Sequence, residues 1–483
     1  MNTFPDRPDR DISRDGGNVG STNGFFRLDG QTKLHKSGDL YAAIEVPARN
    51  ERRNDAPLHP EPMLFECLDY LWFETVTRNG ERLRWSEIFR DAPLAVLELT
   101  DYPLDFPETA RPGDILWYKF AYETTAEGEA HGRLYANLFG GGTTVRIGFH
   151  ELLPPGWPHG GTLGRGGWLT REIAANSTTN VASAEVRKML RRIDASGGVA
   201  IYDVGQGACQ AALDGDRHRP SLYVDFGGGV MFNRRTYPAA LKQFCFSRSP
   251  VIVLSHWDWD HWSSAYRDIT ALSALWLAPP VKEMPIQQAF AADLYTRNRL
   301  RIWHGPQPVE TGSVTLERCT GSTSNDSGIA VTFKRRTRNF LLPGDADYQY
   351  IPSVRQDVSF SGLCLTHHGG VLHSDIYPTP KRGHVSVVSS GPRNTYRHPI
   401  FATLAAHRKG GWAFPTPTAM SGQRPCHIHV PWGQQPYVYR GGCSRGACAI
   451  AIAAIAPDAG GTVHLVKLPP ASKKKKKRTH VSV

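Results

Sequence analysis

The sequence predicts a mixed α/β protein whose larger part is a sandwich of β-sheets flanked by helices. Two features lead to this prediction. In residues 197–468, many short β-rich runs are interspersed with a few helical segments, which is the pattern of sheets covered by helices. In residues 37–152, short alternating runs are separated by glycine-rich turns, which predicts a small β-rich or α+β N-terminal domain.

The expected elements are bounded by glycine, proline and small polar residues. Strands are expected at 115–124, 132–139, 143–149, 199–205, 221–227, 250–256, 312–318, 329–334, 339–345, 362–368 and 384–390, and helices at 181–193, 262–273, 283–298 and 398–409. Residues 153–196 are interpreted as a glycine- and proline-rich linker followed by the first helix. Disorder is expected for residues 1–36 and for the low-complexity tail 469–483.

The composition indicates a globular protein of two or three domains. The chain has 483 residues, of which 40% are hydrophobic and 21% charged, enough for a sizeable core. Its eight cysteines form no CxxC pair, which favours a reducing compartment over a disulfide framework. The N-terminus lacks the apolar core of a secretory signal. The longest apolar run, at 447–457, is too short to span a bilayer and suits a buried strand. We therefore expect a soluble, cytoplasmic protein.

The charge is basic. The formal net charge is +11, and six positive charges lie in the run at 473–478. A basic balance favours acidic partners such as nucleic acid. Three further basic clusters, at 187–192, 297–301 and 334–338, are candidates for following a phosphate backbone.

The stretch "LSHWDWDHWSS" at 254–264 is the strongest candidate for a metal site. His256 ends an apolar run, so the residues after it form a loop at the carboxyl end of a strand, where α/β sheets place ligands. Positions i and i+2 of an extended loop point the same way, so His256 and Asp258 could hold one cation. A tight turn could bring Asp260 and His261 to a second. Imidazole and carboxylate together suit zinc, manganese or iron.

Further candidate ligands follow other strands. Asp345 comes after the apolar run "FLLPG", where a carboxylate could bridge two cations. His367 and His368 end another run, and His398 stands before a proline where a helix can begin. Each of these residues is unremarkable alone, but together they suggest loops that converge on one centre.

The order of these motifs resembles the metallo-β-lactamase fold, and within it most closely the soluble hydrolase domain of the ComEC/Rec2-like DNA-uptake proteins. The resemblance covers residues 197–456. The motifs that carry it are Asp203–Gly207, "HWDWDH" at 256–261, Gly344-Asp345, His367-His368-Gly369 and His398-Pro399. The resemblance implies an αββα sandwich with a metal centre at one edge of its two sheets. The membrane channel of the DNA-uptake proteins is absent from this sequence, so transport is not expected.

Two divalent cations, Zn²⁺ or Mn²⁺, are therefore expected. One hypothesis places His256, Asp258 and either His367 or His368 at one cation, Asp260, His261 and His398 at the other, and Asp345 between them. Asp203 is expected to orient ligands from behind. The residues expected to act in catalysis are Asp260, Asp203 and His368.

The tryptophans of the motif have two interpretations. Trp257 and Trp259 alternate with the ligands, so they either pack beneath the loop as core or form a stacking platform for a nucleobase. Trp262, at the start of the next expected helix, is the better candidate for the wall of the cleft. Together with His368, it is expected to contact the substrate.

The predicted function is that of a dinuclear metal-dependent hydrolase, a phosphodiesterase or nuclease that attacks nucleic acid with a metal-activated water. Nucleic acid is the expected partner, and the N-terminal domain could bind a protein. One alternative is a hydrolase of a small substrate such as a lactone, a thioester or a cyclic nucleotide. Another is a metal-binding regulatory or effector module of a bacterial defence system.

Overall fold

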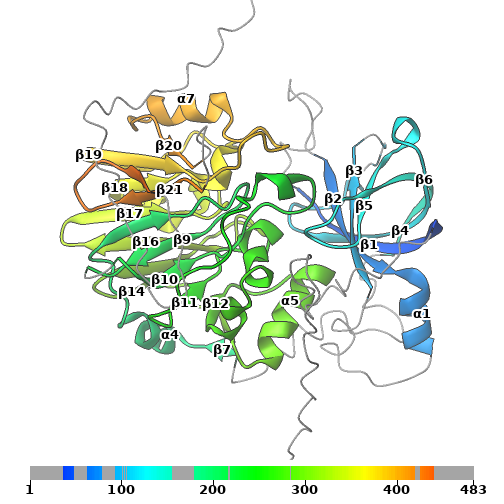
Figure 1. Cartoon of the computed structure of the whole chain (residues 1–483), viewed down its shortest axis with the longest axis horizontal. Coiled ribbons are helices and arrows are strands. Elements are labelled where there is room, and N and C mark those ends of the chain that lie inside the picture. Colours follow the sequence, from blue (N-terminus) through cyan, green and yellow to red (C-terminus); the bar gives the residue numbers. More distant parts are fainter. Residues whose placement is uncertain are drawn as a thin grey trace, which may run out of the picture.

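The structure is a computed structural model of the whole chain, and it describes residues 36–47, 62–78, 93–100, 102, 104, 106–154, 179–215, 218–282, 284–418 and 425–439. These residues form a mixed α/β protein with three sheets and few helices (Figure 1). Among them, no helix is long and apolar enough to cross a membrane. The expectations for residues 1–35, for the apolar run at 447–457 and for the tail 469–483 lie outside the described residues.

The N-terminal part is a closed six-stranded barrel. Its strands follow the order β1-β2-β3-β5-β6-β4. They are β1 (Ser37–Glu45), β2 (Met63–Asp69), β3 (Leu94–Leu99), β4 (Ile115–Thr124), β5 (Gly132–Tyr135) and β6 (Thr143–Leu152), with helix α1 (Tyr70–Arg78) after β2 and a 3₁₀ turn η1 (Glu127–Glu129) after β4. This part of the chain is rich in β-structure, and its assignment as a separate N-terminal domain stays a prediction.

Strand β1 shows how the barrel is joined to the rest of the molecule. Leu40, Ala42 and Ile44 are buried in the core of the barrel. Tyr41 and Ala43 point the other way, as alternate residues of a strand must. These two belong to the apolar cluster that also buries the outer face of the first large sheet. The barrel and the C-terminal part therefore share one continuous core.

The first large sheet has nine strands in the order β22-β21-β8-β9-β10-β11-β12-β13-β7. They are β7 (Asn180–Val181), β8 (Gly198–Ile201), β9 (Gln210–Leu213), β10 (Pro220–Val224), β11 (Val251–Val253), β12 (Trp276–Ala278), β13 (Leu300–Trp303), β21 (His427–Val430) and β22 (Tyr437–Tyr439). Strands β10 to β13 are parallel, so their carboxyl ends lie at the same edge.

The second large sheet has seven strands in the order β14 to β20. They are β14 (Val309–Glu310), β15 (Val314–Arg318), β16 (Ile329–Arg335), β17 (Arg338–Leu342), β18 (Ser359–Cys364), β19 (Thr379–Val388) and β20 (Thr416–Pro417). Strands β17 to β20 are parallel. Their carboxyl ends therefore also share one edge.

The two large sheets bury one apolar cluster between them. Leu222 and Val253 of the nine-stranded sheet lie in the same cluster as Val331 and Leu342 of the seven-stranded sheet. The sheets are also joined near their carboxyl edges, where the Ile329 amide donates to the Ser255 carbonyl oxygen at 2.8 Å. The mixed α/β class is thus confirmed, whereas the assignment to the metallo-β-lactamase family stays a prediction.

Helices α5 and α7 lie on the outer faces of the two large sheets (Figure 1). Helix α5 (Pro285–Thr296) packs between the first large sheet and the barrel. Helix α7 (Phe401–Lys409) covers the second sheet with the short helix α6 (Pro352–Arg355) and the turn η6 (Tyr348–Tyr350). Helix α4 (Ser183–Leu190) precedes β8.

One expected helix is wrong. Residues 262–273 form two 3₁₀ turns, η4 (Ser263–Tyr266) and η5 (Ile269–Ser273). The side chains of Ser263 and Ser264 donate to the carbonyl oxygens of Gly228 and Gly227. These bonds tie the segment to the loop beneath it and interrupt a regular helix.

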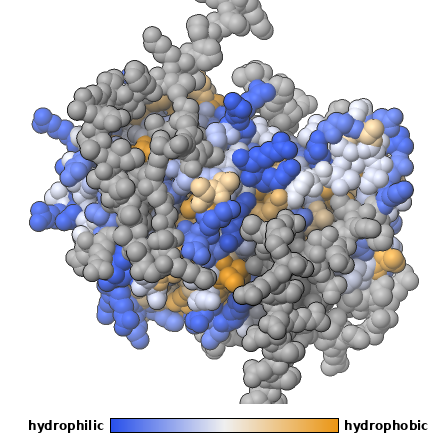
Figure 2. Space-filling view, viewed as in Figure 1, coloured by the Kyte–Doolittle hydropathy of each residue, from blue (hydrophilic) through white to orange (hydrophobic). Residues whose placement is uncertain are grey.

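The surface shown in Figure 2 is mainly hydrophilic over the described residues, with small apolar patches between the polar side chains. Isolated exposed apolar residues such as Leu71 and Phe149 are usual for a protein surface.

Candidate metal centre

Five chain segments meet at the shared carboxyl edge of the two sheets. The loop after β11 carries His256, Asp258 and the 3₁₀ turn η3 (Trp259–His261). The loop after β17 carries Asp345, and the turn η7 (Thr366–Gly369) after β18 carries His367 and His368. The segments after β10 and before α7 contribute Asp225 and His398. The predicted convergence of the strand-end loops is therefore present.

Asp345 lies at the middle of this cluster. Its Oδ1 is 3.2 Å from His261 Nε2. Its Oδ2 is 3.8 Å from the Nε2 atoms of both His256 and His368, and 3.9 Å from His367 Nε2. One buried carboxylate thus faces four imidazoles, which is the position expected for a bridging ligand.

Two compact groups of donor atoms can hold a metal ion. They are His256, His261 and Asp345, and Asp260, His261 and His368, and within each group the donor atoms lie within 4.8 Å of one another. His368 Nε2 lies 3.3 Å from Asp260 Oδ2. Within the described part of the chain, the Nε2 atoms of His256, His261 and His368 are buried and have no hydrogen-bond partner. Buried nitrogens without partners are costly, and a bound cation would satisfy all three.

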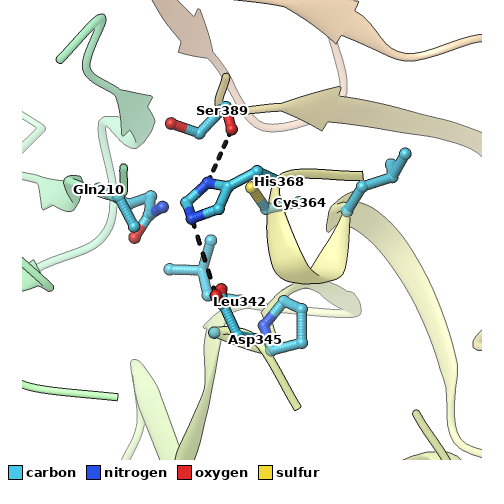
Figure 3. Close-up of a pocket in the computed structure, with 10 residues that line it drawn as sticks. Gln210, Leu342, Asp345, Cys364, His368 and Ser389 are labelled. Atoms are coloured by element: carbon cyan, nitrogen blue, oxygen red, sulfur yellow. Dashed lines mark hydrogen bonds and ion pairs between the residues drawn. The ribbon is translucent and has the colours of Figure 1, made fainter. Parts of the chain in front are cut away.

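The opposite ring nitrogens are held by acceptors. His261 Nδ1 lies 2.9 Å from Asp225 Oδ2, and His368 Nδ1 lies 2.9 Å from the Ser389 carbonyl oxygen (Figure 3). The Ser255 hydroxyl donates to Asp225 at 2.8 Å and lies 3.0 Å from His256 Nδ1. Because a carboxylate and a carbonyl only accept, they hold a proton on Nδ1 of His261 and His368, so that Nε2 is the nitrogen available to a cation at the centre.

Asp225 was not among the predicted site residues. It directly follows β10 and adopts a left-handed backbone conformation with φ of 57°. The available signal was similar to that for Asp345, a carboxylate that follows an apolar run close to a glycine. Its buried position behind His261 and Ser255 could be known only from the packing of β10 beside β11.

The charges of the cluster shift its protonation equilibria. Burial alone would lower the pKa of His261, but the carboxylates of Asp345 and Asp225 raise this pKa well above its usual value. Burial alone would raise the pKa of Asp345, but the imidazoles of His261 and His368 hold it well below its usual value. The pKa of Asp260 is lowered in the same way by His368 and His261. The carboxylates are therefore ionised, and positive charge is stabilised where the two groups meet.

The backbone around the ligands is constrained. His367, His368 and Gly369 have φ values of 47°, 54° and 79°, three consecutive left-handed residues of which two are not glycine. Such backbone persists only where its surroundings enforce it, and it concentrates at functional sites. On the other side of the centre, a Cβ at Gly227 would lie 1.6 Å from the Asp260 carbonyl oxygen, so only glycine allows η3 to approach this closely.

Three predicted ligands lie around the rim of the two groups. Asp258 Oδ2 is 3.4 Å from His256 Nε2, and its side chain is 39% exposed. The His367 side chain is 26% exposed, and its ring lies 5.4 Å from that of the buried His398. The grouping differs from the predicted division of ligands, because His261 belongs to both groups and His368 lies beside Asp260 where His398 was expected.

Asp203 holds a different part of the structure. Its carboxylate accepts hydrogen bonds from the Cys426 amide at 2.9 Å and from the Gly205 amide at 3.4 Å. These bonds fasten the 203–207 turn to the start of β21. Asp225 occupies the orienting position that was expected for Asp203, and a catalytic part for Asp203 stays a prediction.

The tryptophans of the motif anchor the loop after β11, residues 254–264, which we call the metal loop. The indole N–H of Trp257 donates to the Pro279 carbonyl at 2.9 Å, and that of Trp262 donates to the Trp257 carbonyl at 2.7 Å. The Trp259 indole donates to Glu66 of the barrel at 2.8 Å. For Trp257 and Trp259, these contacts fit the interpretation of packing beneath the loop.

The prediction that Trp262 lines the substrate cleft is wrong. Its side chain is fully buried and stacks on Phe290 of α5, with ring centroids 4.2 Å apart and an interplanar angle of 11°. A ring enclosed in this way cannot touch a substrate. His368 does line a small pocket together with Asp345, Gln210 and Ser389 (Figure 3), so its expected contact with substrate stays a prediction.

Two of the basic clusters lie away from the centre. Arg335 and Arg338 end β16 and begin β17, whereas Asp345 follows the other end of β17. The cluster at 297–301 lies at the start of β13, which runs parallel with β11 and β12. Both clusters are therefore at the edge opposite the metal centre and cannot guide a phosphate into it.

Comparisons with known proteins give weak likenesses. No family model and no curated protein matches the sequence. Among solved structures, Zn²⁺-bound PqqB from Methylobacterium extorquens is 9% identical over 48% of this chain and 100% of its own, with a TM-score of 0.28. A mutant of the β-hydroxylase CmlA is 11% identical over 80% of this chain and 79% of its own, with a TM-score of 0.30. CmlA from Streptomyces venezuelae, a diiron β-hydroxylase, is 11% identical over 67% of this chain and 59% of its own, with a TM-score of 0.25. At these values the likenesses define neither the family nor the function of this chain.

Proposed function

We propose that this protein is a metal-dependent hydrolase whose centre binds two divalent cations. The observation that carries the proposal is the convergence of three buried imidazole Nε2 atoms on the carboxylates of Asp260 and Asp345, with no hydrogen-bond partner for these nitrogens among the described residues. The remaining nitrogens of these imidazoles are already held by the groups behind them. A donor set oriented in this way suits a metal better than it suits a network of internal hydrogen bonds.

The donor set also suggests the kind of cation. Imidazole nitrogens and carboxylate oxygens in similar number suit Zn²⁺ or Mn²⁺. His256, His261, Asp260, His368 and Asp345 would hold the ions, with Asp258, His367 and His398 at the rim. When bound, a pair of such ions would lower the pKa of a bound water and would stabilise charge on an attacked oxygen.

The chain's own residues prepare the site for hydrolysis. Asp260 and Asp345 stay ionised because the neighbouring imidazoles lower their pKa values. Asp258, on the exposed side of His256, is placed to take up a proton from an attacking water. The protein thus provides a negative, rigid centre with one open side.

A phosphodiester is the substrate class that we favour. Loop 391–398, which carries His398, presents two exposed arginines, Arg393 and Arg397. Among the described residues, neither arginine forms an ion pair with a carboxylate. Tyr396 stacks on the His398 ring at 5.4 Å and 25° and contacts Phe232 edge to face. Cations and an aromatic ring beside a metal centre suit a phosphate with a nucleobase attached.

A small acyl substrate is the second candidate. Val371 follows η7 and Phe401 begins α7, and they are 50% and 68% exposed. The Ile400 amide donates to the Gly369 carbonyl at 2.8 Å. This bond joins the two segments that carry Val371 and Phe401, and the same segments carry His367 and His398. Such a rim suits the apolar part of a lactone or thioester.

Metal content and hydrolysis test the proposal together. We would measure bound metals by mass spectrometry in wild type, in Asp260→Asn and in the control Asp375→Asn, whose carboxylate is exposed outside the centre. The same samples would be assayed on single-stranded DNA, a chromogenic phosphodiester and a thioester. We expect about two metals and phosphodiester cleavage in wild type and the control, with both reduced in Asp260→Asn.

Each other outcome has a meaning. Cleavage of the thioester alone supports the second candidate. Bound metal without hydrolysis of any of the three substrates supports a regulatory module and refutes both proposed substrate classes. A wild-type protein without metal after reconstitution refutes the metal centre.

A further inference from the structure

Glu66 is a fully buried carboxylate of the barrel that contacts the metal loop. It lies on β2, with an exposed fraction of 0%. Its Oε1 accepts the Trp259 indole N–H at 2.8 Å. Its Oε2 accepts the backbone amides of Ile286 and Gln287 at 2.5 and 3.3 Å. One side chain of the barrel therefore holds both the metal loop and the first turn of α5.

These contacts act directly on the candidate ligands. Trp259 stands between Asp258 and Asp260 in the sequence and begins η3. The α5 helix held by Glu66 also carries Phe290, on which Trp262 stacks. The segment 257–262 is thus fixed at both ends and at its middle, and the middle contact comes from the barrel.

Glu45 makes a second link, to the other sheet. This residue ends β1, and its Oε1 accepts Lys282 Nζ and the Ser324 amide, each at 2.7 Å. In the same loop as Ser324, the carboxylate of Asp326 accepts the Asp347 amide at 2.9 Å. Asp347 is two residues after Asp345. Strand β2 therefore contacts the loop that carries Asp260 directly. Strand β1 reaches the loop that carries Asp345 only through the segment from Ser324 to Asp326.

We propose that the barrel is a positioning element of the metal centre and that Glu66, acting through Trp259, is its principal positioning residue. This inference rests on the proposed function, since it assigns the barrel a part in building that site. The face of the barrel that carries Glu66 and Glu45 is occupied inside the molecule. Binding of a separate partner by this face is therefore excluded.

A matched control is available in the same barrel. Glu98 on β3 is also a buried carboxylate, with an exposed fraction of 4%, and accepts the Tyr135 hydroxyl at 2.7 Å. It has no described contact with the metal loop. A merely structural role for Glu66 predicts that Glu66→Gln and Glu98→Gln behave alike once their stabilities are compared.

The test measures the metal loop in two independent ways. Full-length wild type, Glu66→Gln and Glu98→Gln would be compared by amide hydrogen exchange and by titration with Mn²⁺ and Zn²⁺. We expect exchange in peptides covering 256–262 to become at least tenfold faster in Glu66→Gln. We also expect its metal affinity to fall at least tenfold, with both quantities within twofold of wild type in Glu98→Gln. Trp259→Phe is expected to reproduce the effect of Glu66→Gln, and the double variant to add little to either.

The outcomes separate this inference from the proposed function. Equal exchange in wild type and Glu66→Gln, or equal acceleration in both glutamate variants, overturns the positioning role. If exchange is faster in Glu66→Gln but the wild type binds no metal, the positioning role is supported and the metal-dependent function is refuted. Additive effects of Glu66→Gln and Trp259→Phe overturn the route through Trp259.

Discussion

Replacing Asp225 by asparagine tests whether the groups behind the imidazoles set their affinity for metal. Asp225 Oδ2 accepts from His261 Nδ1 at 2.9 Å and from the Ser255 hydroxyl at 2.8 Å, while Oδ1 accepts the Ser255 amide at 2.6 Å. If the side-chain oxygen of the new asparagine still accepts the hydrogen bond from the Ser255 amide, the side-chain NH₂ group of the asparagine faces His261 Nδ1. An NH₂ group only donates, so the His261 proton moves to Nε2, where it occupies the lone pair needed by a cation.

The expected loss of metal affinity follows from disturbing the orientation of one ligand, His261, in a variant of nearly the same shape. Removing such a partner of a metal-binding histidine weakens the metal by about 10- to 100-fold, which corresponds to about 1.4–2.7 kcal/mol. The assay is a competition titration with a chromogenic chelator on the purified variant. We expect the folded structure to persist, because the side-chain volume barely changes.

Asp214→Asn is the control for this experiment. Asp214 is also buried, but it pairs with Arg219 and Arg248 away from the centre. This variant should lose stability and keep its metal affinity. Wild-type affinity in Asp225→Asn, or an equal loss in Asp214→Asn, would refute the orienting role of Asp225.

Three further predictions concern single side chains. His368→Ala should lower the metal content by about one ion per chain while His367→Ala leaves it unchanged, because only His368 belongs to a compact donor group; mass spectrometry of the two proteins checks this. Trp262→Ala should lower the free energy of unfolding by about 3–5 kcal/mol, since the ring is fully buried; an unchanged free energy of unfolding in urea titrations would contradict the assignment. Burial raises the pKa of Glu66 from 4.5 to about 8, so between these values the folded state binds more protons than the unfolded state and the free energy of unfolding should fall as pH rises. Urea unfolding at pH 5 and pH 8 should show this slope in wild type and a smaller one in Glu66→Gln, and identical slopes would contradict it.

Local sequence patterns were sufficient to predict part of this structure. The strands around 199–205, 329–334 and 339–345 are short apolar runs between glycine or polar residues, and the structure has β8, β16 and β17 there. His256 and Asp345 were predicted as neighbours because both follow such strands, and the structure brings them together.

Other features depend on contacts between distant residues. Trp262 has the sequence context of an exposed helix start, but α5 folds back and buries it. Glu66 is separated from Trp259 by 193 residues, and nothing in the alternation of β2 distinguishes it from a solvent-facing carboxylate. Which of the two tandem histidines joins a donor group depends on the left-handed turn at His367 and His368. The local sequence does not distinguish the two rings, because the turn is set by the packing of the surrounding loops.

His261 gives the centre an inherent asymmetry. Both donor groups include its Nε2 atom, but a single lone pair binds one ion at a time. If two cations were bound, only one could keep this imidazole, so the two ions would be held with unequal strength. The fully loaded form would then appear only above a threshold supply of free cation, and activity would report on the metal available to the cell.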